Sequence, residues 1–225
     1  MRRHNFVLFI FLFLSFSYLH SQSARVFKID SFPTINPHTY TNPGLPLDKN
    51  WLYKKGDDSL WAKSDFDDSK WDTASTSLDL SELPAKTFEG IGWFRIHLSV
   101  DSSLLNKTLA LMILQWGASE IYLDGKLIHT FGKINPKNSS KEEHFNPLEL
   151  PFEIRFEKTS QVLAVRYANS SAMENHIKHI NSTAGFDLKI GEIRSVTLFK
   201  YFGSVIFSVI FIFYFMTPRI SHAPA

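Results

Sequence analysis

The 225-residue sequence contains no cysteine. This absence excludes a disulfide framework, a cysteine nucleophile, a cysteine-ligated zinc site and a lipidated N-terminal cysteine. The chain also has little net charge, with a formal excess of +2 at pH 7. Four of the 24 basic residues lie in the terminal segments, which leaves 20 basic against 22 acidic residues between them; the four are Arg2, Arg3, Lys200 and Arg219. A central part this close to neutral gives no indication of nucleic-acid binding.

The sequence motifs of common enzymes are also missing. There is no Gly-x-Ser-x-Gly elbow and no phosphate-binding loop. A glycosidase needs two carboxylates held roughly 5 to 10 Å apart across a cleft. The adjacent pair Glu142 and Glu143 points apart instead, because neighbouring side chains of an extended chain face opposite ways. We therefore expect a chain that is not an enzyme and that needs no cofactor.

Long apolar runs are confined to the two ends of the chain. Residues 1–24 have a basic start, an apolar run from Phe6 to Leu14 and small residues near Ser21 and Ser23. This order is typical of a cleaved export signal peptide. The alternative is a permanent anchor, but a helix needs about 20 apolar residues to cross a bilayer, and this run is shorter.

The second apolar run extends from Tyr201 to Met216 and carries no charge. It predicts a transmembrane helix over residues 197–217, whereas a buried core segment is the alternative. On this prediction residues 25–196 lie outside the cytoplasm, and residues 218–225 form a short cytoplasmic tail at which the sequence stops early.

Between the two ends the dominant hydrophobic period is two, which is typical of strands. Asp124-Gly125 lies between two apolar stretches and predicts a tight hairpin. Long amphipathic helix patterns are missing, so we predict an all-β, antiparallel jelly-roll β-sandwich over residues 48–196, with residues 25–47 as a linker or strand before it. The expected strands or strand pairs cover residues 51–56, 92–100, 108–115, 119–132, 148–156, 161–169 and 186–193.

Three motifs occur in a specific order along the sandwich region. They are Asp67-Asp68-Ser69-Lys70-Trp71, then Trp93-Phe94-Arg95, then Ile121-Tyr122-Leu123-Asp124-Gly125. In this order they resemble the galactose-binding-like jelly-roll domain. That domain is found in the sugar-binding part of family 2 glycoside hydrolases and in the sensing ectodomains of bacterial seven-transmembrane receptors.

The resemblance and the two apolar ends together predict a function. They favour the periplasmic ligand-sensing domain of a receptor in the bacterial inner membrane, with one span in this chain and its output domain beyond it. The expected partners are the membrane, a small-molecule or carbohydrate ligand and a second copy in a homodimer. Two alternatives stay open: a carbohydrate-binding accessory domain of a glycoside hydrolase, and a membrane-anchored interaction domain complete as it stands.

Two residues are candidates for ligand contact. Trp116 follows an apolar strand and precedes Gly117, so its ring is expected at a strand end, where it would either stack on a sugar or cap the core. Arg95 lies on the opposite face of its strand from Phe94. We expect it to pair with a carboxylate such as Asp67 or Asp68, with ligand contact as the alternative. The loop of residues 133–146 is a further candidate.

At the closely spaced Asp65, Asp67 and Asp68 we expect turn chemistry and no metal, with Asp and Ser side chains that accept hydrogen bonds from free backbone N–H groups. A weak calcium site is the alternative, because calcium takes oxygen ligands. A zinc site is a weaker hypothesis, from the spacing of Glu174, His176 and His179.

Overall fold

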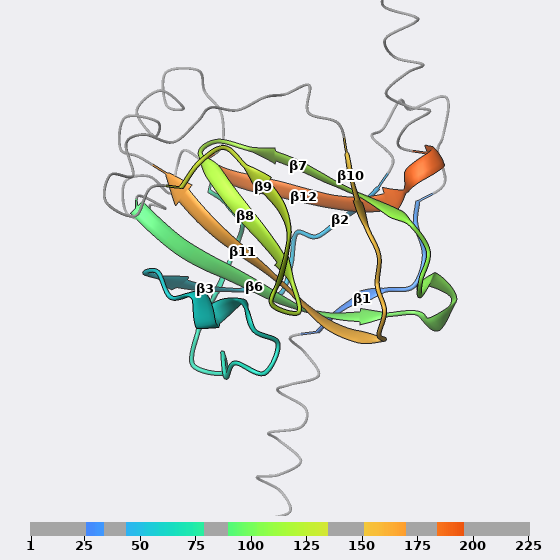
Figure 1. Cartoon of the computed structure of the whole chain (residues 1–225), viewed down its shortest axis with the longest axis horizontal. Coiled ribbons are helices and arrows are strands. Elements are labelled where there is room, and N and C mark those ends of the chain that lie inside the picture. The colour runs from blue at the N-terminus through green and yellow to red at the C-terminus, as the bar shows by residue number, and fades with distance from the viewer. Residues whose placement is uncertain (1–25, 34–43, 79–89, 135–150, 170–183, 196–225) are drawn as a thin grey trace, which may run out of the picture.

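The computed structural model describes residues 26–33, 44–78, 90–134, 151–169 and 184–195. These residues form two packed β-sheets (Figure 1). The predicted signal peptide and transmembrane helix lie outside the described residues. Within the described ranges, no helix is long and apolar enough to cross a membrane.

The larger sheet has seven strands. Its order is β4 (Asp72–Ala74), β3 (Trp51–Lys55), β6 (Gly90–Val100), β11 (Ser160–Asn169), β8 (Ala118–Leu123) and β9 (Lys126–Phe131), with β1 (Val26–Ile29) beside the second half of β6. The β1–β6 pairing is parallel, and the other pairings in this sheet are antiparallel.

The smaller sheet has five strands, all paired antiparallel. They are β10 (Phe152–Ile154), β7 (Leu109–Gln115), β12 (Ala184–Glu192), β2 (Leu45–Pro46) and β5 (Ser77–Leu78). The predicted all-β, antiparallel sandwich is thereby confirmed.

The main core lies between the two sheets. Strand β6 contributes alternate residues to it, because successive side chains of a strand point to opposite faces. Phe94 has no exposed surface, and its ring meets the edges of Trp51 and Phe186 at centroid distances of 6.5 and 5.0 Å. Phe186 comes from β12 in the smaller sheet. These ring contacts therefore join the two layers.

The predicted Asp-Gly hairpin connects β8 to β9. Asp124 has a φ of 48°, which the two-residue turn requires, and Gly125 has a φ of 85°. The Asp124 carboxylate also accepts hydrogen bonds from the backbone N–H of Val162 (2.8 Å) and the side chain of Gln161 (3.0 Å). The turn is therefore tied to the start of β11.

Candidate functional site

The outer face of the seven-stranded sheet is covered by residues 57–71, here named the covering segment. It begins with the short 3-10 turn η1 (Ser59–Ala62), whose cap Asp58 accepts a hydrogen bond from the N–H of Leu60 at 2.9 Å. Under it lie the outward-facing residues of β6, which include Trp93 and Arg95. Trp61 and Trp71 of the segment pack with Trp93 in a second hydrophobic cluster, separate from the main core.

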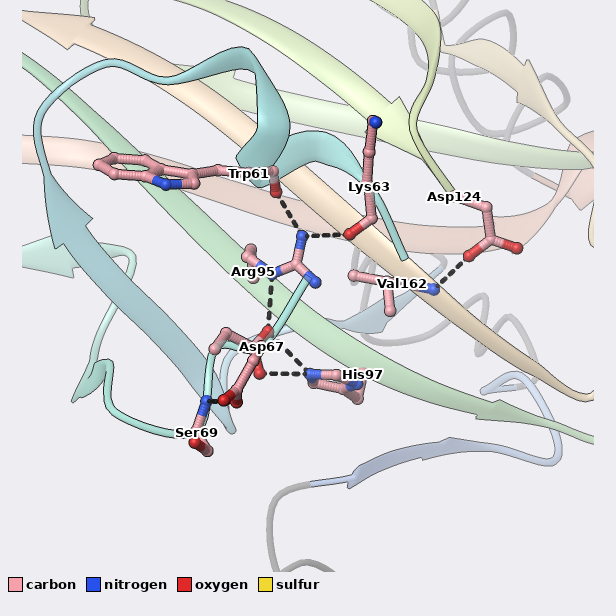
Figure 2. A network of polar contacts seen from close by, with 9 residues as sticks. Trp61, Lys63, Asp67, Ser69, Arg95, His97, Asp124 and Val162 are labelled. Carbon is pink, nitrogen blue, oxygen red and sulfur yellow. Dashed lines mark hydrogen bonds and ion pairs between the residues drawn. The ribbon is translucent and has the colours of Figure 1, made fainter. Parts of the chain in front are cut away.

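Arg95 fastens the covering segment to the sheet (Figure 2). Its side chain has no exposed surface, and its Nε donates to Oδ2 of Asp68 at 2.6 Å. Its Nη1 donates to the backbone carbonyls of Trp61 and, at 2.9 Å, Lys63. The expected pairing with a nearby aspartate is therefore present. A ligand on the surface could touch Arg95 only if the covering segment moved away.

Asp68 is shared between two partners. Besides Arg95, it contacts Nε2 of His97, whose distances to the two carboxylate oxygens are 2.9 and 3.0 Å. Burial alone would raise the pKa of the Asp68 carboxyl, but the hydrogen bonds from His97 and Arg95 outweigh this effect and lower it. The ionised carboxylate is thus the form that the folded protein favours.

The weak calcium hypothesis for Asp65, Asp67 and Asp68 is not supported. Within the described ranges, no three histidine, aspartate or glutamate side chains are grouped to hold a metal ion. Asp67 instead accepts a hydrogen bond from the N–H of Ser69 at 3.0 Å, and the hydrogen bonds of Ser69 lower the pKa of its carboxyl. The expected turn chemistry is therefore present at Asp67, whereas the Asp68 carboxylate is bound to Arg95 and His97. Glu174, His176 and His179 lie outside the described residues, as does most of the loop of residues 133–146.

A second charged group on the same face was not predicted from the sequence. Arg166 of β11 donates from Nε and Nη2 to Asp57 at 2.7 and 2.6 Å, and from Nη1 to Glu120 at 3.1 and 3.2 Å. The hydroxyl of Tyr122 donates to Glu120 at 2.6 Å. Burial and this acceptor raise the pKa of Tyr122. We name the ionisable residues joined by these contacts on this face the outer-face network; its members are Asp57, Asp68, Arg95, His97, Glu120 and Arg166.

Trp116 lies where the chain crosses from the smaller sheet to the larger one, between β7 and β8. The next residue, Gly117, has a φ of 98°, and a Cβ there would collide with the carbonyl oxygen of Ala168. Only glycine fits this close approach of two backbones. Trp116 is partly buried and packs against the main core. The backbone N–H of Trp116 donates to the carbonyl of Gly185 at 3.1 Å, and its backbone carbonyl accepts a hydrogen bond from the hydroxyl of Tyr167.

Near the crossing from β7 to β8, the space between the two sheets is lined by polar side chains. Gln115 continues the inward face of Leu111 and Ile113, and Ser119 continues the inward face of Ile121. Both are buried, at 1% and 0% exposure. Nε2 of Gln115 donates to the carbonyl of Gly117 at 3.2 Å, but Oε1 of Gln115 and Oγ of Ser119 have no hydrogen-bond partner. We name this region the neutral end; its members are Gln115, Trp116, Gly117, Ser119 and Tyr167.

No family model and no curated protein matches the sequence. Among solved structures, the chain is similar to a glycosyl hydrolase family 2 member from Bacteroides cellulosilyticus, at 21% identity and a TM-score of 0.43, over 66% of this chain and 20% of that one. It is also similar to Bacteroides uniformis beta-glucuronidase, at 19% identity and a TM-score of 0.43, over 65% of this chain and 17% of that one. A third similar structure is Faecalibacterium prausnitzii beta-glucuronidase, at 12% identity and a TM-score of 0.41, over 71% of this chain and 32% of that one.

The matched part thus spans between 17% and 32% of the length of these hydrolases. At these identities and TM-scores, the likeness to one part of each enzyme carries no conclusion about activity. The resemblance to receptor ectodomains stays a prediction.

Proposed function

We propose that the sandwich is a non-catalytic carbohydrate-binding domain and that the neutral end is its binding site. The observation that carries this proposal is the place of Trp116, a partly buried indole at a sandwich end whose lining is polar but uncharged. Sugars present apolar C–H faces to aromatic rings and hydroxyl groups to neutral hydrogen-bonding partners. The partly buried ring of Trp116 offers the first kind of contact, and the buried side chains of Gln115 and Ser119 could offer the second only if the neutral end opened.

The pKa values of Asp57 and Asp68 argue against a hydrolytic role for these two carboxylates, whereas that of Asp187, which burial raises, gives no such argument. A glycosidase needs one carboxylic acid whose pKa is raised, so that it can protonate the leaving group. The pKa of Asp57 is lowered, chiefly by its hydrogen bond with Arg166, and that of Asp68 is lowered by His97 and Arg95 against the opposing effect of burial. Both carboxyls are therefore poor proton donors near neutral pH.

The direct test is saccharide binding by the full chain. A glycan array would select neutral oligosaccharides, and titration calorimetry would compare the wild type with Trp116→Ala and Trp116→Phe. We expect the alanine variant to lose most of the affinity, because stacking on an aromatic ring contributes on the order of 1 kcal/mol or more. The phenylalanine variant keeps a ring and should retain part of it.

The matched control for this test is Leu114→Ala. Leu114 lies two residues before Trp116, and 53% of its surface is exposed, so its removal should change neither folding nor binding. A wild-type chain that binds no saccharide would overturn the proposal, and so would a folded Trp116→Ala variant with unchanged affinity.

A second proposal concerns the place of the domain. We propose that the chain is exported and anchored, as the sensing part of a bacterial membrane receptor would be. The support is in the sequence, where the uncharged run from Tyr201 to Met216 follows the last described strand. Two charges near the centre of this run, as in Val209→Lys with Ile210→Lys, would disfavour insertion by several kcal/mol.

Membrane fractionation of bacterial cells that express the full chain would test this placement. The wild type should sediment with membranes and be cut by protease added to the periplasmic side, and the double variant should become soluble. A wild-type chain found in the soluble fraction would contradict the anchored placement without affecting the binding proposal.

A further inference from the structure

The five-stranded sheet presents charged and apolar side chains on its outer face, where β7 and β12 lie side by side (Figure 1). We propose that a second copy of the chain packs on this face in a two-fold symmetric dimer, with Asp187 of each copy opposite Lys189 of the partner subunit. Such a dimer is isologous, because both copies use the same surface. It does not depend on saccharide binding.

Strand β12 supplies the charges of this surface. Phe186, Leu188 and Ile190 are buried in the main core. Because successive side chains of a strand point to opposite faces, Asp187 and Lys189 point outward. Asp187 is exposed and Lys189 is partly exposed.

Strand β7 supplies the apolar part of the surface. Ile113 packs against the main core, so Met112 and Leu114 on either side of it point outward. Leu114 is 53% exposed. In the β7–β12 register Leu114 is beside Asp187, and Met112 is beside Lys189. The surface therefore has two levels, each with one apolar and one charged residue.

The two charges of β12 do not neutralise each other directly. They are two residues apart on one strand, roughly 7 Å. Within the described ranges, neither Asp187 nor Lys189 is in an ion pair. Although Asp187 is exposed, partial burial by the chain around it raises the pKa of its carboxyl, and Lys189 offsets this effect only in part. A second cation close to Asp187 would favour its charged form.

A two-fold axis can supply that cation to both copies at once. We place the axis between the two packed sheets, at right angles to the strands and at the level of Leu188. The rotation reverses the strand direction, so the residues before and after Leu188 change places, and Asp187 of each copy lies opposite Lys189 of the partner subunit. By the same rotation Leu114 lies opposite Met112 of the partner subunit.

The spacing of packed sheets suits these contacts. Sheets that pack face to face are about 10 Å apart, which side chains from both sides can fill. The dimer then has two ion pairs and two apolar contacts. An axis along the strands would keep equal residues at one level and would offer no such pairing of opposite charges.

The first test is chemical cross-linking in bacterial cells that express the full chain. The chain has no cysteine, so a single introduced cysteine is the only thiol. Leu114→Cys with a short bismaleimide should give a cross-linked dimer. Thr73→Cys is the matched control, because Thr73 is exposed on β4 of the other sheet, and it should give little product.

Charge reversal then tests the pairing of the two copies on the Leu114→Cys background. Asp187→Lys puts two cations opposite each other at two symmetric places, so the cross-linked fraction should fall roughly tenfold. Adding Lys189→Asp swaps the charges and should restore the product. Asp72→Lys, at an exposed aspartate of β4, is the control and should change nothing.

Two results would overturn the inference. One is a Leu114→Cys chain that gives no more cross-linked dimer than Thr73→Cys. The other is a charge-swapped chain that stays as poorly cross-linked as Asp187→Lys while its urea midpoint equals that of the reporter chain. The proposed binding function stands or falls separately, on the Trp116 variants.

Discussion

The outer-face network and the neutral end use polar groups in opposite ways. In the first, charged side chains from the covering segment and three strands bind one another, so that Arg166 alone contacts both Asp57 and Glu120. In the second, uncharged side chains lie between the sheets and leave two buried oxygen atoms without a partner. Charged pairs therefore hold a surface segment against the sheet, while the neutral groups between the sheets are only partly hydrogen-bonded.

The outer-face network lies beside a separate hydrophobic cluster, whereas Trp116 and Tyr167 of the neutral end pack with the main core. Trp61 and Trp71 meet edge to face at a centroid distance of 5.2 Å, and Trp93 stacks on Tyr122 at 5.4 Å. Such aromatic pairs add roughly 0.5–1.5 kcal/mol each beyond the area that they bury. The covering segment is therefore a packed layer with its own small core, and Arg95 is buried beneath it.

The largest predicted effect comes from breaking the ion pair under the covering segment. Asp68→Asn leaves the buried guanidinium of Arg95 without its anionic partner and should lower the free energy of unfolding by about 3–5 kcal/mol. Urea unfolding followed by tryptophan fluorescence would measure this loss. Asp67→Asn is the control, because Asp67 is exposed and bonds only within its own turn. Equal losses for the two variants would contradict the role assigned to Asp68.

A smaller effect is expected at the neutral end, from Gly117→Ala. The positive φ and the collision with the carbonyl of Ala168 should together lower the free energy of unfolding by about 1–3 kcal/mol. Gly125→Ala is a matched control with a positive φ of 85° but no atom closer than 3.5 Å to the added Cβ. Thermal unfolding of both variants would separate the effect of the positive φ, which both share, from that of the collision, which only Gly117→Ala has. An equal loss of stability would show that the chain relieves the collision by a small shift.

Acid pH should sharpen the same comparison. The pKa values of Asp57 and Asp68 are lowered in the folded chain, so their stabilisation is complete above the unfolded value near 3.9 and is lost as the pH falls through the folded values. The slope is at most about 1.4 kcal/mol per pH unit for each carboxyl. Unfolding of the wild type and Asp68→Asn from pH 7 to pH 2 should show a stability difference that shrinks only below about pH 4. A constant difference would argue against ionised Asp68 as its source.

The smallest predicted effect concerns the free energy of unfolding of Ser119→Ala. Because the hydroxyl of Ser119 has no partner, its removal should leave this free energy within about 0.5 kcal/mol of the wild type or raise it by up to about 1 kcal/mol. Differential scanning calorimetry without ligand would measure it. A loss of 2 kcal/mol or more would mean that Ser119 serves the fold.

The local patterns of the sequence predicted much of the fold. Strict alternation in residues 92–100 predicted the inward face of β6, and Asp124-Gly125 predicted the hairpin between β8 and β9. The pairing of Arg95 with Asp68 was also expected, because a buried charge without a partner of opposite charge is strongly destabilising.

Features that depend on strand register could not be predicted in the same way. Arg166 meets Asp57 and Glu120 only because β11 lies between β6 and β8, an order that no local pattern contains. The parallel pairing of β1 with β6 was missed for the same reason. Gln115 was expected simply as the last residue of its strand, and its unpartnered oxygen became visible only when both sheets were in place.

The central place of β11 has a consequence for how the chain folds. Its ten residues pair with β6 on one side, where Asn169 meets Gly90, and residues 163–168 pair with β8 on the other. The seven-stranded sheet therefore cannot be completed until β11, late in the chain, has been synthesised. Proteins dominated by such distant pairings fold slowly, on the order of milliseconds to seconds. Until β11 arrives, β6 and β8 both present an open edge, and chaperones that bind nascent chains would find their most exposed target there.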